Sequence, residues 1–140
     1  MPPAPFVAQE SAVPLEAWGD PLSATVTWRT LLSGDRTPTK GLTLGVAEVP
    51  ADPDAAWRLH RHAQAEAYYI LSGHGVLRID GADHPLAPGT TAFIPGGAWH
   101  QARATQSETL RLLYVFAADS FSDVVYEFED GAGDLSGRGP

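Results

Sequence analysis

The sequence predicts an all-β fold, a sandwich or barrel of short strands, in one domain of 140 residues. Runs of β-branched and aromatic residues recur at close spacing from residue 24 onward. Glycine, proline and aspartate separate these runs, as at residues 50–54, 88–89 and 95–97, and such residues favour turns. Strands at this spacing are typical of all-β domains.

The elements are expected in the following order. Residues 1–23, rich in proline, alanine and glutamate, should form an irregular arm with a short helical turn near Leu15–Trp18. The domain should extend over residues 24–130, where Ser120–Glu129 fits either a final strand or a helix. Residues 131–140 should be a disordered tail. The expected strands cover residues 25–31, 42–49, 57–62, 66–71, 76–80, 91–94, 99–102 and 110–117.

The charge balance disfavours two classes of partner. Nine basic and seventeen acidic residues give a net charge of −8, which repels nucleic acid and anionic membrane surfaces. The absence of cysteine excludes disulfides, thiolate metal sites and cysteine nucleophiles. The sequence shows neither a secretory signal nor an apolar run long enough to span a membrane, so a cytoplasmic protein is expected.

Three histidines and a glutamate form the first candidate site. His60 and His62 are two residues apart, so on a strand both side chains point to the same face. Glu66 has the same parity and returns to that face if the chain bends at residues 63–65, and His100 comes from a later strand. Four such ligands suit several divalent transition metals and leave open positions on an octahedral ion. The alternative is a set of hydrogen-bonded polar residues in a metal-free β core.

The spacing of these residues resembles the two sequence motifs of the cupin superfamily. The run His60-x-His62-x3-Glu66-x6-Gly73 is similar to the first motif, and Gly89-x5-Pro95-x-Gly97-x2-His100 is similar to the second. Eight of the ten motif positions match. The departures are Asp54, where the first motif often opens with glycine, and Ala104, where the second often ends with asparagine.

This resemblance covers residues 42–117 and implies a small single-domain bacterial cupin with a jelly-roll barrel. It implies one divalent transition metal (Fe, Mn, Ni or Zn) inside the barrel, held by His60, His62, Glu66 and His100. It also implies a homodimer. The exposed edges of an open sandwich favour the same assembly, with the N-terminal arm and the Trp28 strand covering an edge of the partner.

Tyr68 is the candidate catalytic residue. It shares the parity of Glu66 and should project its phenol toward the metal, whereas Tyr69 should face away. A tyrosine at this position resembles the small cupin lyases that cleave dimethylsulfoniopropionate, in which a tyrosine so placed acts as base. A nearby cation stabilises phenolate, which can remove a proton α to a carboxylate. The alternative is a core aromatic with a hydrogen-bonded hydroxyl.

Two further residues are candidates for substrate binding. Arg58 precedes His60 by two positions, so its guanidinium should lie at the pocket mouth, where it could hold a carboxylate bidentately. The alternative for Arg58 is a solvated position at a sheet edge. On the last strand Arg111 should point outward, so Tyr114, which has the opposite parity, should point into the barrel. There Tyr114 is either a phenol of the pocket or a packing residue of the core.

Three functions fit the sequence. The first is a metalloenzyme of the lyase, isomerase or cyclase type that acts on a small carboxylate- or carbonyl-bearing molecule by proton abstraction, with Tyr68 as base. The second is an Fe(II)-dependent dioxygenase, in which open metal positions bind substrate and O₂. The third is a non-catalytic module that binds a small molecule. The acidic charge disfavours a DNA-binding sensor.

Overall fold

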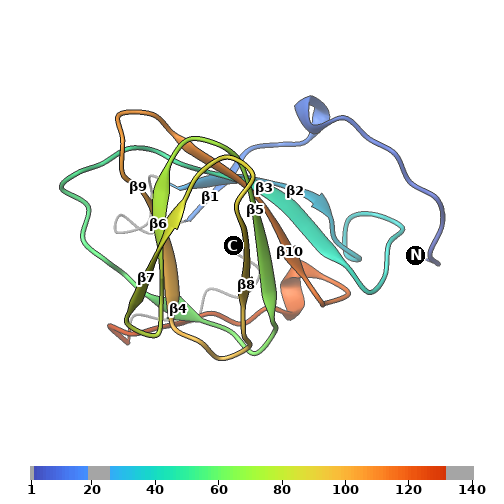
Figure 1. The fold of residues 1–140 in the computed structure, drawn as a ribbon. Coiled ribbons are helices and arrows are strands. Elements are labelled where there is room, and N and C mark those ends of the chain that lie inside the picture. Colours follow the sequence, from blue (N-terminus) through green and yellow to red (C-terminus); the bar gives the residue numbers. More distant parts are fainter. Residues whose placement is uncertain (1, 19–25, 132–140) are drawn as a thin grey trace.

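Two antiparallel sheets face each other in the computed structural model, which describes residues 2–18 and 26–131 (Figure 1). The six-stranded sheet has the order β1-β2-β3-β10-β5-β8, and the five-stranded sheet has the order β11-β4-β9-β6-β7. The described residues contain no α-helix, only the short 3₁₀-helices η1 and η2. The all-β prediction is therefore confirmed.

The strands of the six-stranded sheet are β1 (Glu16–Ala17), β2 (Thr27–Leu32), β3 (Thr43–Val49), β5 (Glu66–Ser72), β8 (Thr91–Ile94) and β10 (Leu110–Phe116). Those of the five-stranded sheet are β4 (His60–Arg61), β6 (Gly75–Ile79), β7 (Ala82–Leu86), β9 (His100–Ala104) and β11 (Glu127–Phe128). The helix η1 spans Glu10–Ala12, and η2 spans Phe121–Asp123.

The predicted helical turn near Leu15–Trp18 is wrong. Glu16 and Ala17 instead form β1, which pairs with β2 in antiparallel register. The Glu16 carboxylate fixes this pairing, because Oε2 accepts a hydrogen bond of 2.6 Å from the Thr30 hydroxyl and lies 2.9 Å from the Arg36 guanidinium. The Trp28 strand is thus covered within its own chain, and Trp28 is 2% exposed.

Other elements differ from the prediction in extent. The strand expected at residues 57–62 is reduced to β4, because the chain before it crosses the end of the sandwich as a loop. Strand β7 was not predicted, since its first four side chains are exposed and give no alternating pattern. The segment Ser120–Glu129 forms both η2 and β11 rather than one element. Of the predicted tail, residues 132–140 lie outside the described part.

Alternation along β10 builds the core as predicted. Leu112, Tyr114 and Phe116 are at most 1% exposed and point into the sandwich. Arg111 points outward and pairs with Glu10 of the N-terminal arm. Tyr114 and Tyr68 are partners in the register of β10 and β5, so their side chains lie on the same inner face.

Close packing around Tyr114 yields a stability prediction. A methyl group at Gly45 would meet the Tyr114 phenol and would lie 2.6 Å from the carbonyl oxygen of Arg29. Gly45→Ala should therefore lower the free energy of unfolding by about 1–3 kcal/mol, measured by urea denaturation. The exposed edge substitution Thr91→Ala should change it by less than about 0.5 kcal/mol. If the urea midpoint of Gly45→Ala equalled that of the wild type, the Tyr114 ring could not be tightly packed against this position.

The part of the chain that the structure describes includes no helix long and apolar enough to cross a membrane. Formation of a homodimer, and the domain limits at residues 24 and 130, stay predictions.

A candidate metal centre and its pocket

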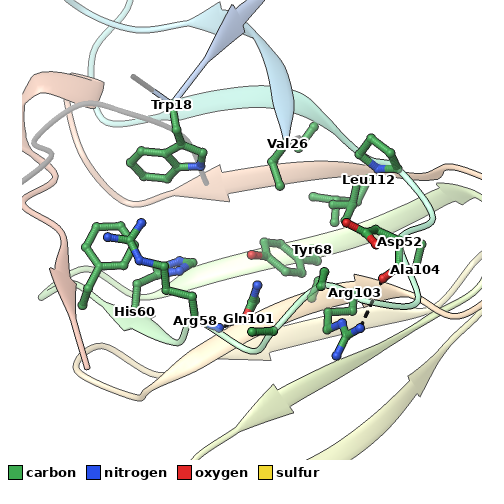
Figure 2. A pocket seen from close by; sticks show the side chains of 17 residues that line it. Trp18, Val26, Asp52, Arg58, His60, Tyr68, Gln101, Arg103, Ala104 and Leu112 are labelled. Atoms are coloured by element: carbon green, nitrogen blue, oxygen red, sulfur yellow. Dashed lines mark hydrogen bonds between the residues drawn. The ribbon is translucent and has the colours of Figure 1, made fainter. Parts of the chain in front are cut away.

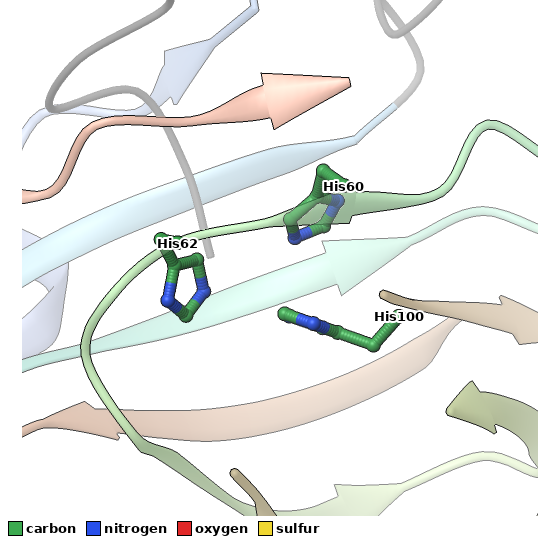
Figure 3. Close-up of side chains that lie close together, drawn as sticks. All are labelled: His60, His62 and His100. Carbon is green, nitrogen blue, oxygen red and sulfur yellow. The ribbon is translucent and has the colours of Figure 1, made fainter. Parts of the chain in front are cut away.

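Three buried histidines converge between the two sheets. His60 in β4 is the register partner of His100 in β9, and His62 follows β4 directly. The ring centroids of His60 and His100 are 4.4 Å apart, and those of His62 and His100 are 5.1 Å apart. One nitrogen from each ring lies within 4.8 Å of the others, and Figure 3 shows the rings turned toward one another. This group could hold one metal ion.

Glu66 faces the histidines from the opposite sheet. The bend after His62 carries the chain from β4 in one sheet to β5 in the other. Glu66 was predicted on the same face as the histidines, and it points into the same interior from the opposite sheet instead. Its Oε1 lies 3.3 Å from Nε2 of His62 and 3.2 Å from Nε2 of His100. Two ligand atoms that bind one ion at a right angle, each at about 2.1 Å, are about 3 Å apart. These separations therefore fit a shared ion.

Backbone carbonyl groups orient two of the rings. Nδ1 of His62 is 2.9 Å from the carbonyl oxygen of Gln64, and Nδ1 of His100 is 2.9 Å from that of Ala98. A carbonyl oxygen only accepts, so each Nδ1 carries a hydrogen, and Nε2 is the nitrogen of each ring that faces Glu66. Two imidazole nitrogens and a carboxylate oxygen thus meet in a buried space, where one cation could contact all three. The residues fit a divalent metal.

Tyr68 lies on the same inner face as Glu66. Tyr68 is 3% exposed and Tyr69 is 46% exposed, so Tyr68 faces the interior and Tyr69 faces outward, as alternation predicts. That the Tyr68 phenol lies toward a metal stays a prediction. Burial, followed by the charge of Glu66, raises the pKa of Tyr68 well above its usual value. A divalent cation acts in the opposite direction, because it stabilises phenolate. The phenol is therefore neutral without a cation and is a candidate base beside one.

Tyr126 is a second buried phenol that the sequence analysis did not single out. Its ring centroid lies 5.2 Å from that of His60 and 5.3 Å from that of His62. Burial is the main reason why its pKa is raised well above the usual value. Alternation along Val124, Tyr126 and Phe128, all of which are buried, was the signal that could have found it.

A pocket opens beside His60 and Tyr68, beneath the β3–β4 loop (Figure 2). The cavity has a volume of about 80 Å³. Its walls are mixed, with polar groups from Asp52, Arg58, His60, Tyr68, Gln101 and Arg103. The apolar walls include Trp18, Val26, Ala47, Val49, Leu112 and Phe128.

The two predicted substrate-binding residues lie in different places. Arg58 is in the pocket wall, with Nε 3.0 Å from Oδ2 of Asp130 and its guanidinium carbon 3.9 Å from the centre of the Phe128 ring. Its side chain is only 10% exposed, unlike a solvated edge arginine. Tyr114 is buried but is not among the described residues that line the pocket. Its ring centroid lies 5.8 Å from that of Phe116 in the core.

Comparison with known proteins agrees with this geometry. Residues 46–116 match a family model described as the cupin domain. The dimethylsulfoniopropionate lyase DddW of Ruegeria pomeroyi is 37% identical over 132 residues, which cover 94% of this chain and 85% of that protein. An oxalate-binding protein of Thermotoga maritima is 33% identical over 86 residues, which cover 61% of this chain and 69% of that protein.

Solved structures are similar in fold. A predicted oxalate decarboxylase from Thermotoga maritima superposes with a TM-score of 0.68 at 27% identity, over 81% of this chain and 99% of that one. The polyketide cyclase RemF of Streptomyces resistomycificus superposes with a TM-score of 0.67 at 24% identity, over 81% of this chain and 79% of that one. The latter similarity concerns the fold alone.

Proposed function

Because the chain belongs to the cupin family, we propose that it is a metal-dependent lyase that abstracts a proton α to a carboxylate, with dimethylsulfoniopropionate as substrate. The observation that carries this proposal is Tyr68, a buried phenol on the inner face beside Glu66 that lines the same pocket as His60 and Arg58. The similarity to a dimethylsulfoniopropionate lyase over nearly the whole chain supports the choice of substrate.

In this proposal four residues hold the ion: His60, His62, Glu66 and His100. Imidazole with carboxylate suits Fe, Mn, Ni or Zn and does not choose among them. When bound, the ion supplies a Lewis acid for the substrate carboxylate. The carbonyl groups of Gln64 and Ala98 keep the Nε2 lone pairs of His62 and His100 available for it.

Tyr68 performs the proton transfer in the proposed reaction. Its phenolate oxygen takes the proton from the carbon next to the carboxylate. The electron pair of that C–H bond becomes the new carbon–carbon double bond, and the carbon–sulfur bond breaks with its pair remaining on sulfur. The products are acrylate and neutral dimethyl sulfide. The proton then leaves Tyr68 for solvent, so the phenolate is restored and the reaction consumes no oxidant.

Arg58 has a positioning role in this account. Its ion pair with Asp130 and its contact with the Phe128 ring hold the guanidinium against one wall of the pocket. The carboxylate of the substrate can then approach both Arg58 and the metal end at His60, since both line the same pocket. Tyr114 has no substrate contact in the proposal, because it packs in the core instead.

The function is tested by incubating dimethylsulfoniopropionate with purified protein loaded in turn with Fe, Mn, Ni or Zn. At least one metal form should release acrylate and dimethyl sulfide in equal amounts. Removal of the metal by a chelator should abolish the release, and addition of the same metal should restore it. Absence of either product from every metal form would contradict the proposed substrate.

A further inference from the structure

One wall of the pocket comes from outside the part of the chain that matches the family model. Trp18 follows β1 at the end of the described N-terminal arm, whereas the family match begins at residue 46. The ring is 7% exposed and lines the pocket together with His60 and Tyr68 (Figure 2). The N-terminal arm therefore contributes part of the pocket wall.

Trp18 is one aromatic ring away from the candidate metal centre. Its centroid lies 5.2 Å from that of Tyr126 and 5.7 Å from that of Phe128. Those two rings lie 5.2 Å and 6.0 Å from the ring of His60. A short molecule whose carboxylate is held at the metal end can therefore reach the indole with its other end.

The arm holds this indole in place. Strand β1, which ends one residue before Trp18, pairs with β2, and the Glu16 carboxylate bonds to Thr30 and Arg36. The Trp28 ring packs against Trp18 with centroids 5.5 Å apart. A side chain fixed on several sides loses little freedom when a ligand binds, which suits a recognition surface.

Two guanidinium groups line the pocket, and each already has a partner of its own. Arg58 pairs with Asp130, and Arg103 donates to the carbonyl oxygen of Asp52 and lies over the Trp57 ring. Asp52 is the acidic side chain among the described lining residues, and Figure 2 shows it on the other side of Tyr68 from Trp18. The Phe128 ring is already covered by the Arg58 guanidinium at 3.9 Å. The indole ring is the strongest cation–π partner among the aromatic side chains. The part of the indole that lines the pocket is therefore the aromatic surface available to a cationic substrate group.

We propose that Trp18 is a specificity-determining residue whose ring binds the positively charged sulfur or nitrogen of an onium carboxylate. The inference rests on the proposed function, in which the carboxylate of the same molecule is directed to the metal end of the pocket. It adds that selection of the charged group depends on the N-terminal arm rather than on the two cupin motifs.

The test compares a charged ligand with a neutral one of the same shape. Binding of dimethylsulfoniopropionate and of 4-methylpentanoate, in which a CH group replaces the sulfonium, is measured by calorimetry on metal-loaded protein in which Tyr68→Phe slows turnover. The variants below are made in this Tyr68→Phe background. Trp18→Leu should weaken binding of the sulfonium ligand by about tenfold and that of the neutral ligand by about threefold or less. In Trp18→Phe the preference for the sulfonium ligand over the neutral one should lie between those of the Trp18 protein and Trp18→Leu. Phe93→Leu, which removes an aromatic ring 68% exposed on β8, should change neither affinity.

Equal weakening of both ligands in Trp18→Leu would overturn the proposal, because the indole would then be only an apolar wall. Unchanged binding of both ligands would overturn it too. If Trp18→Leu fails to fold, the graded preference of Trp18→Phe decides by the same criterion. Because binding is measured in the Tyr68→Phe background, it is independent of cleavage. A sulfonium preference that depends on Trp18, together with a wild-type protein that does not cleave the substrate, would contradict the proposed reaction and leave the role of Trp18 supported.

Discussion

Replacement of His62 by alanine is expected to leave the folded protein with well under one metal ion per chain and to lower kcat/KM by about a thousandfold or more. His62 contributes no strand pairing, since it follows β4, but its Nε2 lies 3.3 Å from Glu66 at the point where the ligand atoms converge. Loss of one imidazole leaves the Glu66 carboxylate buried without that partner. Metal analysis of the purified variant, beside its rate, checks the prediction.

The matched control is His74→Ala. His74 is 43% exposed and contacts Glu108 on the surface, so its loss should leave both metal content and rate unchanged. If His62→Ala kept a full equivalent of metal and its activity, the ion would have to bind elsewhere. The proposed centre would then be wrong.

Replacement of Tyr68 by phenylalanine should lower kcat by about 10²–10⁴-fold without loss of metal. The change removes one oxygen atom and keeps the ring, so that packing between the sheets is preserved. Because the proposed ligands remain, metal content should equal that of the wild type. Steady-state rates and metal analysis on the same preparation separate the loss of a base from the loss of the ion.

Tyr69→Phe is the control for this substitution, because its side chain is 46% exposed on the outer face of the same strand. It should leave kcat within about twofold of the wild type, as expected for a surface change. A Tyr68→Phe variant of undiminished activity would remove Tyr68 from the mechanism. Tyr126, the other phenol beside His60, would then be the group to replace next.

Period-two alternation explains why much of the site could be predicted from the sequence. On β5 it directs Glu66 and Tyr68 inward and Tyr69 outward, and the burial of the three side chains agrees. Alternation also places His60 and His62 in the interior. It does not reveal that the histidines and Glu66 belong to opposing sheets, since that depends on the bend between β4 and β5.

The contributions of the chain termini could not be predicted, because they depend on tertiary contacts. Trp18 reaches the pocket through pairing of the two-residue strand β1, which is too short to show a pattern. Alternation indicates that Tyr126 is buried, but it does not place the ring beside His60, because that depends on the pairing of β11 with β4. For Arg58 the sequence indicates the face to which the side chain points. It does not indicate its ion-pair partner, Asp130, which is 72 residues away.

The most direct test of elimination at a histidine-held metal is to measure product formation and O₂ consumption together. The active metal form is incubated with dimethylsulfoniopropionate in air and under strict anaerobiosis, while acrylate and dissolved O₂ are followed. Proton abstraction by Tyr68 predicts equal rates of acrylate formation in both conditions and no O₂ uptake. Uptake of O₂ in proportion to substrate consumed, with no reaction under anaerobiosis, would contradict the lyase and favour a dioxygenase.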